Sequence, residues 1–368
     1  MPKPWFSSFF RRFSNHRQQR SPRRTLIVLA AILFVAAFGD WLANDPNKSV
    51  IPPLIPYAAK DLDVKNSSLL PPFAPQNSLY FRHWLGTDVN GRDVAAGLIA
   101  GTRTALFVGI GGVLLALLIG LPIGLAAGFY GDNRLEMNFL GFILRGVMIG
   151  TALFYFYVFL NLKESGFSIL IKISAIFIFL LLIIEVLEKF IFSKIKILNK
   201  KITVPLDLIV MRLVEIMQGI PLIMWILAAL TVIGNLNLSS LILLIGATSW
   251  TGFVRLVRGE MIRIRQLEYM EAAEVLGASP TRILMRHALP NVLTPVLIAF
   301  SFGISNGILL EAFLSFIGLG LAAEEVTWGT MLMSARTDWG SWWLAVFPGL
   351  AIFLTVYAFN RLGEILTE

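Results

Sequence analysis

Residues 104–130 of the chain read TALFVGIGGVLLALLIGLPIGLAAGFY and contain no charged residue. A helix needs about 20 apolar residues to cross the hydrocarbon core of a bilayer, which is about 30 Å thick. This stretch therefore predicts a transmembrane helix, long enough to cross even when tilted, and it points to a membrane protein.

The composition of the whole chain agrees with a membrane protein. Of its 368 residues, 56% are hydrophobic and only 15% are charged, whereas about 25% are charged in an average soluble domain. The mean hydropathy is +0.74. Eight apolar windows predict an all-α integral membrane protein of about eight spans. They are Leu26–Ala43, Thr104–Tyr130, Met137–Leu160, Phe167–Phe190, Leu208–Ile233, Leu238–Leu256, Val292–Gly318 and Trp342–Phe359.

Basic residues predict the orientation of the chain. The first 24 residues contain seven Lys and Arg and no acidic residue, directly before the first window. Cytoplasmic flanks carry such an excess, so we expect both termini in the cytoplasm of a multi-pass protein of the cytoplasmic (inner) membrane. The net charge of +8 is thereby explained without nucleic acid. A cleaved signal peptide is the alternative, which the long apolar run and the lack of a small-residue cleavage site disfavour.

The windows divide the chain into segments with different expected environments. Residues 1–24 form a basic cytoplasmic tail, residues 25–43 the first span and residues 44–101 an irregular, proline-rich extracytoplasmic segment. Residues 102–363 form the main transmembrane domain, and residues 364–368 end the chain in the cytoplasm.

The windows also differ in whether their residues are suited to contact with another helix or with lipid. Gly120, Gly124 and Gly128 recur every four residues along one helix face, which permits the backbone of another helix to approach closely. The alternative is an incidental stripe in a glycine-rich chain. The window Phe167–Phe190 is rich in Ile, Leu and Phe, as expected against lipid. With Met137–Leu160 it predicts a peripheral hairpin.

The cytoplasmic link at residues 265–291 is polar but helical in pattern. Met270, Ala273 and Leu276 recur at three-residue spacing and predict a narrow apolar helix face. Gly277 follows where a helix C-cap requires a left-handed turn. A first short helix is therefore expected to end at this glycine.

A second short helix is expected after the turn. Ser279 is a suitable N-cap, and Pro280 is favoured in the first turn of a helix. This helix is predicted to end near Leu289-Pro290. The link therefore predicts two short helices, joined by a sharp bend, against the inner membrane face.

This link resembles a known signature. Glu271-Ala272-Ala273, Gly277 and Leu289-Pro290 are similar to the E-A-A-x3-G-x9-I-x-L-P signature of permease subunits in bacterial ABC importers, although His287 replaces the isoleucine. The resemblance implies that the bend is the coupling helix, which seats in a groove of a cytoplasmic ATPase and pairs Glu271 with a basic group. The ATPase-coupling residues are then Glu271, Ala272, Ala273, Gly277, Ser279, Pro280, Leu289 and Pro290. An ordinary amphipathic link is the alternative.

The chain before the second window narrows the resemblance. The run His83-Trp84-Leu85-Gly86-Thr87-Asp88, followed by Gly91-Arg92-Asp93, is similar to the H-x-L-G-T-D-x-x-G-R-D segment of C-type subunits in dipeptide and oligopeptide importers. Its motif residues are Gly86, Thr87, Asp88, Gly91, Arg92 and Asp93. The similarity extends over about residues 83–363 and implies a type I ABC importer transmembrane fold.

The chain departs from that family by an insertion. In the family, the end of the second span leads almost directly to the start of the third, at positions that match Gly131 and Asp207. Here residues 132–206 separate them and contain the expected hairpin. Because an even number of spans is added to a six-span core, the link stays cytoplasmic.

Several chemistries are excluded or disfavoured. The phosphate-binding G-x-x-x-x-G-K-[ST] motif is absent from the sequence. The G-x-S-x-G match at Gly303–Gly307 lies inside the predicted span Val292–Gly318 rather than on a strand-to-helix turn, so we expect no catalytic residue and no ATPase activity in this chain. Cysteine is absent, and His16, His83 and His287 are far apart, so neither a metal nor a cofactor is expected. Two rivals remain: a membrane enzyme, which predicts a polar cluster at one membrane depth, and a passive channel, which predicts flux without nucleotide.

Charged residues inside spans are functional candidates because their burial is costly. Glu311 is a candidate for a pathway or gating role, the alternative being a satisfied hydrogen bond between helices. Arg145 is expected to extend to the near interface. Four tryptophans predict an aromatic belt at the membrane interface rather than substrate stacking. They are Trp328, Trp339, Trp342 and Trp343.

The resemblance implies partners and a substrate class. The partners are a second homologous permease subunit, cytoplasmic ABC ATPase subunits, an extracytoplasmic substrate-binding protein and the lipid bilayer. ATP binding by the ATPases pulls on the bend and switches the spans between inward and outward access. The expected cargo is peptides or similar small solutes. Nickel chelates, opines and peptide-nucleotide antibiotics are the alternatives.

Overall fold

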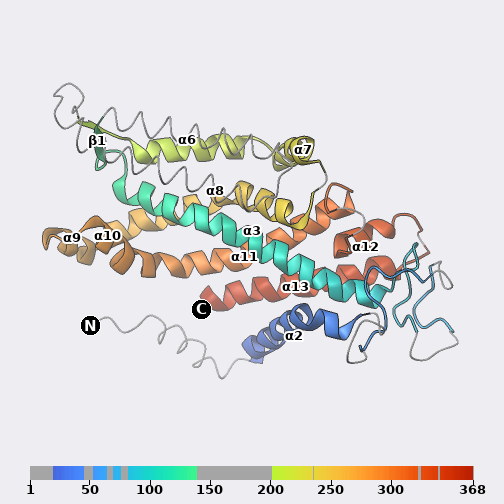
Figure 1. Ribbon diagram of the computed structural model, residues 1–368. Helices are drawn as coiled ribbons and strands as arrows, with labels where there is room; N and C mark the ends of the chain where they lie inside the picture. The colour runs from blue at the N-terminus through green and yellow to red at the C-terminus, as the bar shows by residue number, and fades with distance from the viewer. Residues whose placement is uncertain are drawn as a thin grey trace. The chain divides into compact units, whose positions relative to one another are not determined.

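The computed structural model describes residues 20–44, 53–63, 69–75, 82–138, 201–234, 236–321, 325–338 and 340–367. Its regular structure is helical apart from one two-stranded antiparallel sheet (Figure 1). The helices are α2 (Arg20–Leu42), α3 (Val94–Tyr130), α6 (Leu206–Gly219), α7 (Leu222–Ile233), α8 (Leu238–Arg265), α9 (Glu268–Val275), α10 (Pro280–Arg282), the π-helix η3 (Ile283–Ala288), α11 (Leu289–Phe316), α12 (Trp328–Ser334) and α13 (Trp343–Thr367). The strands are β1 (Glu136–Asn138) and β2 (Lys201–Thr203).

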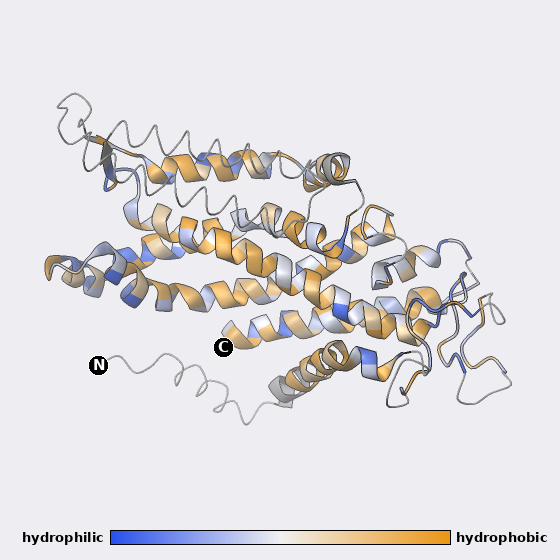
Figure 2. Cartoon of the chain, viewed as in Figure 1, coloured by the Kyte–Doolittle hydropathy of each residue, from blue (hydrophilic) through white to orange (hydrophobic). Residues whose placement is uncertain are grey.

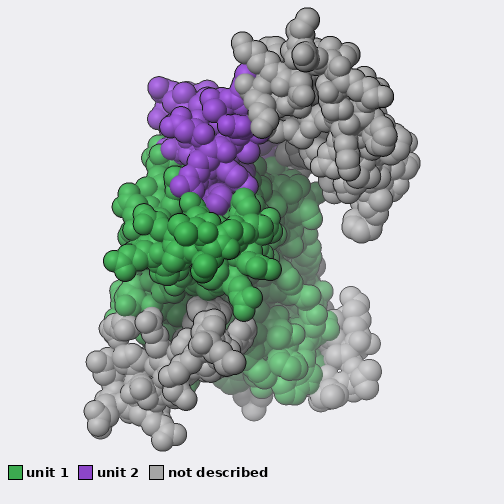
Figure 3. Space-filling model, turned by 90° about the vertical axis from the view of Figure 1, so that its left-hand side faces the viewer, with its two compact units in different colours: residues 1–122, 235–368 green, residues 123–234 purple. Residues whose placement is uncertain are grey.

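The chain divides into two compact units. Unit 1 contains residues 1–122 and 235–368, and unit 2 contains residues 123–234 (Figure 3). Within unit 1, α11 packs against α8, α12 and α13, and α13 also packs against α2. Apolar residues run along these helices, whereas polar residues gather around α9 and α10 at one end of the unit (Figure 2). This distribution is expected of helices that meet lipid or each other along their length and water at their ends.

The helices confirm a predominantly α-helical, multi-pass membrane protein. Five helices in the described residues are long and apolar enough to cross a membrane, or six spans if the bent pair α6 and α7 counts as one. They coincide with six of the eight predicted windows. Of the other two, Met137–Leu160 begins in β1 instead of a helix, and its remainder lies with Phe167–Phe190 outside the described residues.

The window Leu208–Ile233 is not one straight helix as predicted. It is broken into α6 and α7, whose axes differ by 81°. Pro221 has no N–H to continue the hydrogen bonds of α6, and it disfavours the helical conformation at the residue before it. Ile220 is accordingly extended, with φ −93° and ψ 124°. Composition identified the apolar segment, but the bend depends on this one proline.

Helix α3 begins earlier than predicted. It starts at Val94, inside the segment 44–101 that was expected to be irregular, and not at Thr104. The Asp93 carboxylate caps the helix, since its Oδ1 accepts the Ala96 N–H at 2.7 Å. The predicted window began only after Arg103, although residues 94–101 (VAAGLIAG) contain no polar side chain. An Asp directly before an apolar run is a start signal that was available in the sequence.

Glycines allow α3 to lie against its neighbours in unit 1. A Cβ added to Gly120 would lie 2.7 Å from the main-chain oxygen of Trp250 in α8. The predicted close approach at Gly120 is therefore confirmed. Further contacts of this kind were not predicted: a Cβ on Gly112 would meet an α8 side chain at 2.7 Å, and one on Gly109 would meet Ile308 of α11 at 2.8 Å.

Two of the predicted interfacial tryptophans are instead buried. Trp328 of α12 is 2% exposed, and its Nε1–H donates to a main-chain carbonyl of α3 at 3.0 Å. Trp343, at the start of α13, is 5% exposed and donates to the Thr87 carbonyl at 3.1 Å. Trp328 thus joins α12 to α3, and Trp343 joins α13 to the segment before α3, so the aromatic-belt interpretation is wrong for them. Trp342 is exposed, and Trp339 lies outside the described residues.

The two flanks of the expected insertion meet within unit 2. β1 pairs with β2 in antiparallel register, Glu136 opposite Thr203. One step further out, the Asp207 N–H donates to the Gly131 carbonyl at 3.3 Å. The chain therefore leaves and re-enters this region at adjacent positions, as expected if residues 132–206 were inserted at a single point.

The contact at Gly120 yields a first prediction. In Gly120→Ala the added methyl must displace a main-chain carbonyl, which cannot rotate away, so the protein is expected to lose about 1–3 kcal/mol of stability. The matched control is Gly252→Ala in α8, where no heavy atom lies within 4 Å of the added Cβ. Thermal unfolding of the purified full-length chain measures both. Equal unfolding temperatures for the two variants would contradict the close approach.

Candidate functional site

The elbow is the segment of residues 266–290 between α8 and α11. Its first half is α9, which ends in two reciprocal hydrogen bonds: the Gly277 N–H donates to the Glu274 carbonyl at 2.9 Å, and the Ala278 N–H donates to the Ala273 carbonyl at 3.1 Å. This is a Schellman cap, whose left-handed residue is usually glycine. Gly277 has φ +74°. The C-cap predicted from the sequence is confirmed.

The second half of the elbow begins as predicted. The Ser279 Oγ accepts the Arg282 N–H at 3.4 Å, a long contact, and Pro280 occupies the first turn of α10. Proline is favoured there because its missing N–H has no partner inside the helix. The elbow is therefore bent by local sequence signals on both sides of Gly277.

The second short helix does not end near Leu289-Pro290, contrary to the prediction. It continues through the π-helix η3 into α11, forming one helical segment Pro280–Phe316. The Leu289 N–H donates to the Leu284 carbonyl, five residues back. This wider turn accommodates Pro290, which has no N–H and whose ring would clash with the carbonyl four residues back in a regular helix. The elbow and α11 therefore form one continuous element.

Buried apolar side chains pack the elbow against the end of α8. Met270 of α9 and Ile283 of η3 are almost fully buried, as are Met261 and Ile264 near the end of α8. Each such side chain adds about 1.5–3 kcal/mol through its burial. The three helices are therefore held at a fixed angle.

A hydrogen bond that the sequence analysis missed supports this packing. The Asn291 Nδ2 donates to the Tyr269 hydroxyl at 3.0 Å and to the His287 carbonyl at 2.7 Å, which joins α9 to the start of α11. Burial raises the pKa of Tyr269, although the nearby Arg263 and the Asn291 hydrogen bond oppose the shift. The hydroxyl therefore stays protonated at neutral pH.

The outer surface of the elbow exposes apolar and charged side chains together. We call Glu271, Val275, Leu276 and Met285 the elbow tip. Val275 and Leu276 are 88% and 86% exposed. The predicted apolar face of Met270, Ala273 and Leu276 is therefore wrong: Met270 points into the protein and Leu276 out of it.

The charges of the elbow tip are available to a partner. Glu271 is exposed, and its carboxylate makes no hydrogen bond or ion pair within the described part of the chain. Arg282 and Arg286 are also exposed on the same elbow. Ala272 is exposed and Ala273 is half-buried beside Glu271, so small side chains flank the carboxylate. An apolar tip with a ring of charges is suited to binding another protein.

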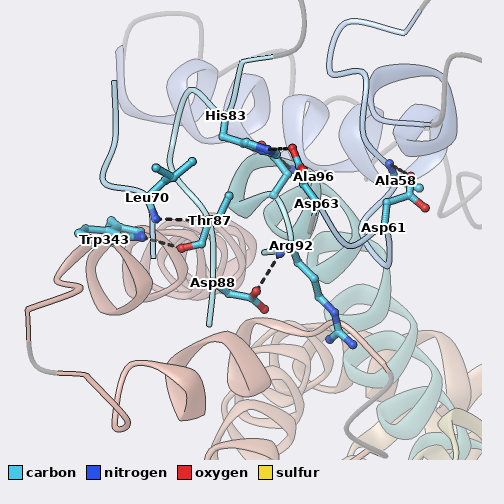
Figure 4. A network of polar contacts seen from close by, with 11 residues as sticks. Ala58, Asp61, Asp63, Leu70, His83, Thr87, Asp88, Arg92, Ala96 and Trp343 are labelled. Atoms are coloured by element: carbon cyan, nitrogen blue, oxygen red, sulfur yellow. Dashed lines mark hydrogen bonds and ion pairs between the residues drawn. The ribbon is translucent and has the colours of Figure 1, made fainter. Parts of the chain in front are cut away.

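The residues of the second motif lie at the other end of unit 1, around the start of α3 (Figure 4). We call residues 82–93 the α3 knot. Gly86 has φ +85°, and a Cβ there would lie 2.3 Å from the Leu70 carbonyl oxygen. Thr87 bonds Leu70 twice, since its N–H donates to the Leu70 carbonyl at 3.1 Å and its Oγ1 accepts the Leu70 N–H at 3.0 Å.

The remaining motif residues close the α3 knot on itself. The Asp88 Oδ1 accepts the N–H groups of Asn90 and Arg92, both at 2.8 Å, across a turn in which Gly91 has φ +79°. Asp93 then caps α3. The motif residues therefore shape the turn before α3 and cap that helix, and they do not approach the elbow.

His83 joins the α3 knot to a second segment. It is fully buried and stacks on Tyr57, with ring centroids 4.1 Å apart. Its Nδ1 lies 2.8 Å from Asp93 Oδ2, and its Nε2 lies 3.3 Å from Asp63 Oδ2. Burial lowers the pKa of His83, but the hydrogen bonds and negative charges of Asp93 and Asp63 outweigh it and raise the pKa overall.

Glu311 lies on α11, close to its contact with α12. It is fully buried, and its Oε1 accepts the Ser315 hydroxyl of the same helix at 2.9 Å, whereas Oε2 has no partner among the described residues. One hydrogen bond of Glu311 therefore lies within α11, and the side chain of Thr327, the N-cap of α12, also interacts with the carboxyl group. In the described ranges no three His, Asp or Glu side chains gather to hold a metal ion.

Comparison with known proteins agrees with this architecture. Residues 197–367, which include the elbow, match the family described as "Binding-protein-dependent transport system inner membrane component". The chain is therefore similar to permease subunits of ABC importers. This assigns the elbow to the part of the permease that the family shares, whereas the α3 knot and the first span precede the matched residues.

Curated relatives extend the similarity over most of the permease. A glutathione transport system permease protein of Pectobacterium atrosepticum is 28% identical over 98% of this chain and 88% of its own length. A dipeptide transport system permease protein of Bacillus subtilis is 28% identical over 77% of this chain and 66% of its own. An oligopeptide transport system permease protein of Haemophilus influenzae is 25% identical over 92% and 80%. All three relatives are named as permease proteins.

The Schellman cap yields the second prediction. Gly277→Val forces a β-branched residue into a left-handed conformation, which costs about 1–2 kcal/mol and reorients α9 against α10. No heavy atom lies within 4 Å of the new Cβ, so the effect is on the backbone alone. The variant is expected to insert at normal abundance and to lose ATP-driven uptake.

The control for this prediction is Gly277→Asn, because asparagine adopts the left-handed conformation more readily. It is expected to retain most of the uptake. Wild-type uptake by Gly277→Val would remove the elbow from the transport mechanism.

Proposed function

We propose that the elbow is the coupling element of this permease and that its tip seats in a groove of a cytoplasmic ABC ATPase. The single observation that carries this is the exposure of Val275 and Leu276 beside Glu271, on a turn that is otherwise rigidly packed. Such apolar side chains are unfavourable in water and become favourable when a partner covers them. The Glu271 carboxylate then pairs with a basic group of the ATPase.

The continuity of the elbow with α11 explains how a movement at the tip reaches the membrane. A displacement of α9 by the closing ATPases is carried by the packed residues Met270 and Ile283 to the segment Pro280–Phe316. That segment contacts α8, α12 and α13. Packed helices move as rigid bodies, so the elbow switches the spans between inward and outward access.

The proposed topology has eight spans. Six correspond to the helices and the bent pair of the described residues, and two lie in the inserted segment at residues 132–206. The basic first 24 residues favour a cytoplasmic N-terminus. An even number of spans then returns the C-terminus to the cytoplasm. The elbow faces the cytoplasm in this arrangement, and the α3 knot faces the outside.

The proposed assembly contains a second homologous permease subunit, two ATPase subunits and an extracytoplasmic substrate-binding protein. The family description, with its binding-protein-dependent transport system, supports the last of these. The translocation pathway lies between the two permeases. Glu311 is proposed to act at the α11–α12 contact during gating, because it is a buried carboxylate where α12 lies closest to α11: a Cβ on Gly329 would be 2.5 Å from the Ala312 carbonyl.

The proposed cargo is a short peptide. The relatives are named for glutathione, dipeptide and oligopeptide transport, and these share a peptide backbone. Nickel chelates, opines and peptide-nucleotide antibiotics are not favoured by these names. The test is uptake of labelled glutathione, a dipeptide and an oligopeptide into proteoliposomes that contain the full complex. Uptake of one of them only with ATP supports the proposal, whereas equal flux without nucleotide would indicate a passive channel.

The elbow tip yields the third prediction. Leu276→Asp places a charge in the centre of the proposed contact, where burying it unpaired costs several kcal/mol. The variant is expected to lose copurification with the ATPase subunit while it inserts normally.

The matched control is Leu54→Asp, the same change at a residue that is 77% exposed in the segment 53–63. It is expected to retain the ATPase. Normal copurification of Leu276→Asp would contradict the assignment of the elbow tip as the docking surface.

A further inference from the structure

We propose that His83 is a protonated clasp that fastens the segment 53–63 to the start of α3, and that the opening of this clasp makes transport sensitive to pH on the side of the α3 knot. The clasp consists of His83, Asp63 and Asp93, with Tyr57 stacked on the imidazole ring. It deepens the proposed function, because the side on which it lies rests on the proposed topology.

The hydrogen-bond geometry favours the charged form of the imidazole. Both ring nitrogens face a carboxylate oxygen, Nδ1 toward Asp93 at 2.8 Å and Nε2 toward Asp63 at 3.3 Å. A neutral imidazole has one N–H, so its other nitrogen would direct a lone pair at a carboxylate. Only the imidazolium donates at both positions, and it also neutralises part of the charge of two buried or half-buried carboxylates.

The clasp joins two separate segments of the chain. Asp63 belongs to the segment 53–63, and Asp93 stands directly before α3. The Asp63 N–H also donates to the Gly91 carbonyl at 3.2 Å, so the two segments are aligned when the clasp is closed. Since Asp93 uses its Oδ1 to cap α3 and its Oδ2 for His83, protonation of the imidazole is linked to the first turn of a transmembrane helix.

The pH window follows from the groups that face His83. The segment 53–63 contributes Asp63 and Tyr57, and the α3 knot contributes Asp93. Tyr57 stays neutral, because burial and the two carboxylates raise its pKa to about 12. The two aspartates raise the pKa of His83 above its ordinary value. The clasp is therefore fully closed below about pH 6.5, the pKa of an unfolded histidine, and opens as the pH rises through the raised value.

Hydrogen exchange of the full-length permease in lipid nanodiscs tests the clasp directly. Amide protection of the segments 53–63 and 82–93 is measured from about pH 5 to about pH 9, on either side of the ordinary histidine pKa, after correction for the intrinsic exchange rate. Wild-type protection is expected to fall as the pH rises. In His83→Gln it is expected to be low and independent of pH. A pH-dependent loss of protection that persists in His83→Gln would overturn the clasp.

Two carboxylate variants keep the test decisive if His83→Gln fails to fold. Asp93→Asn retains the N-cap, since Asn caps helices as well as Asp, but removes one charge. Its midpoint is expected to move to lower pH by about one unit or more. Asp63→Asn is expected to move the midpoint in the same direction. The control is Asp61→Asn, in the same segment, whose carboxylate accepts the Ala58 N–H and makes no contact with His83. An unchanged midpoint in both Asp63→Asn and Asp93→Asn would overturn the proposal.

The transport assay separates this inference from the proposed topology. Uptake by the reconstituted complex is expected to decrease as the pH is raised in the outer compartment alone, and His83→Gln is expected to remove the dependence. If the same His83-dependent effect follows the inner compartment instead, the clasp stands and the proposed topology is wrong. If uptake in the wild type varies with neither compartment while exchange protection does, the clasp has no role in transport.

Discussion

The structure depends on one constraint: inside a bilayer core no water is available to bond the peptide groups, so the backbone must satisfy itself. The long apolar runs meet this requirement as helices. Two segments with irregular backbone, the elbow and the α3 knot, lie at opposite ends of unit 1. In both, main-chain N–H and C=O groups find hydrogen-bond partners within the chain. The elbow uses the Schellman cap at Gly277, and the knot uses the Asp88 carboxylate and the paired groups of Thr87 and Leu70.

The same two ends treat their apolar and polar groups in opposite ways. The elbow buries Met270 beneath a tip that exposes Leu276, so its surface is unfavourable until another protein covers it. The α3 knot instead buries polar groups, among them His83 and Asp93, and satisfies them inside the chain. One end thus exposes the apolar surface that the proposed ATPase would cover, and the other end is held together by hydrogen bonds among buried polar groups.

Features set by neighbouring residues could be predicted from the sequence, whereas most contacts between residues distant in the sequence could not. The apolar run at residues 104–130, the left-handed turn at Gly277 and the cap at Ser279 follow from neighbouring residues, and each was predicted. Pro290 appeared to end a helix, but a π-turn accommodates it, and only the surrounding packing selects that turn. The tryptophans of α12 and α13 looked interfacial because nothing in their neighbourhood reveals partners far away in the chain. The contact between His83 and Asp63 could not be predicted for the same reason, because neighbouring residues do not reveal it.

The pairing of β1 with β2 has a consequence for how such permeases diversify. Because Gly131 and Asp207 are already hydrogen-bonded neighbours, the chain between them can change length or be exchanged for another module without altering the connection that it bridges. The two strands are held together by main-chain hydrogen bonds, which do not depend on which side chains the strands carry. A segment of a different length can therefore be accommodated at this point without altering the bonds between its two flanks.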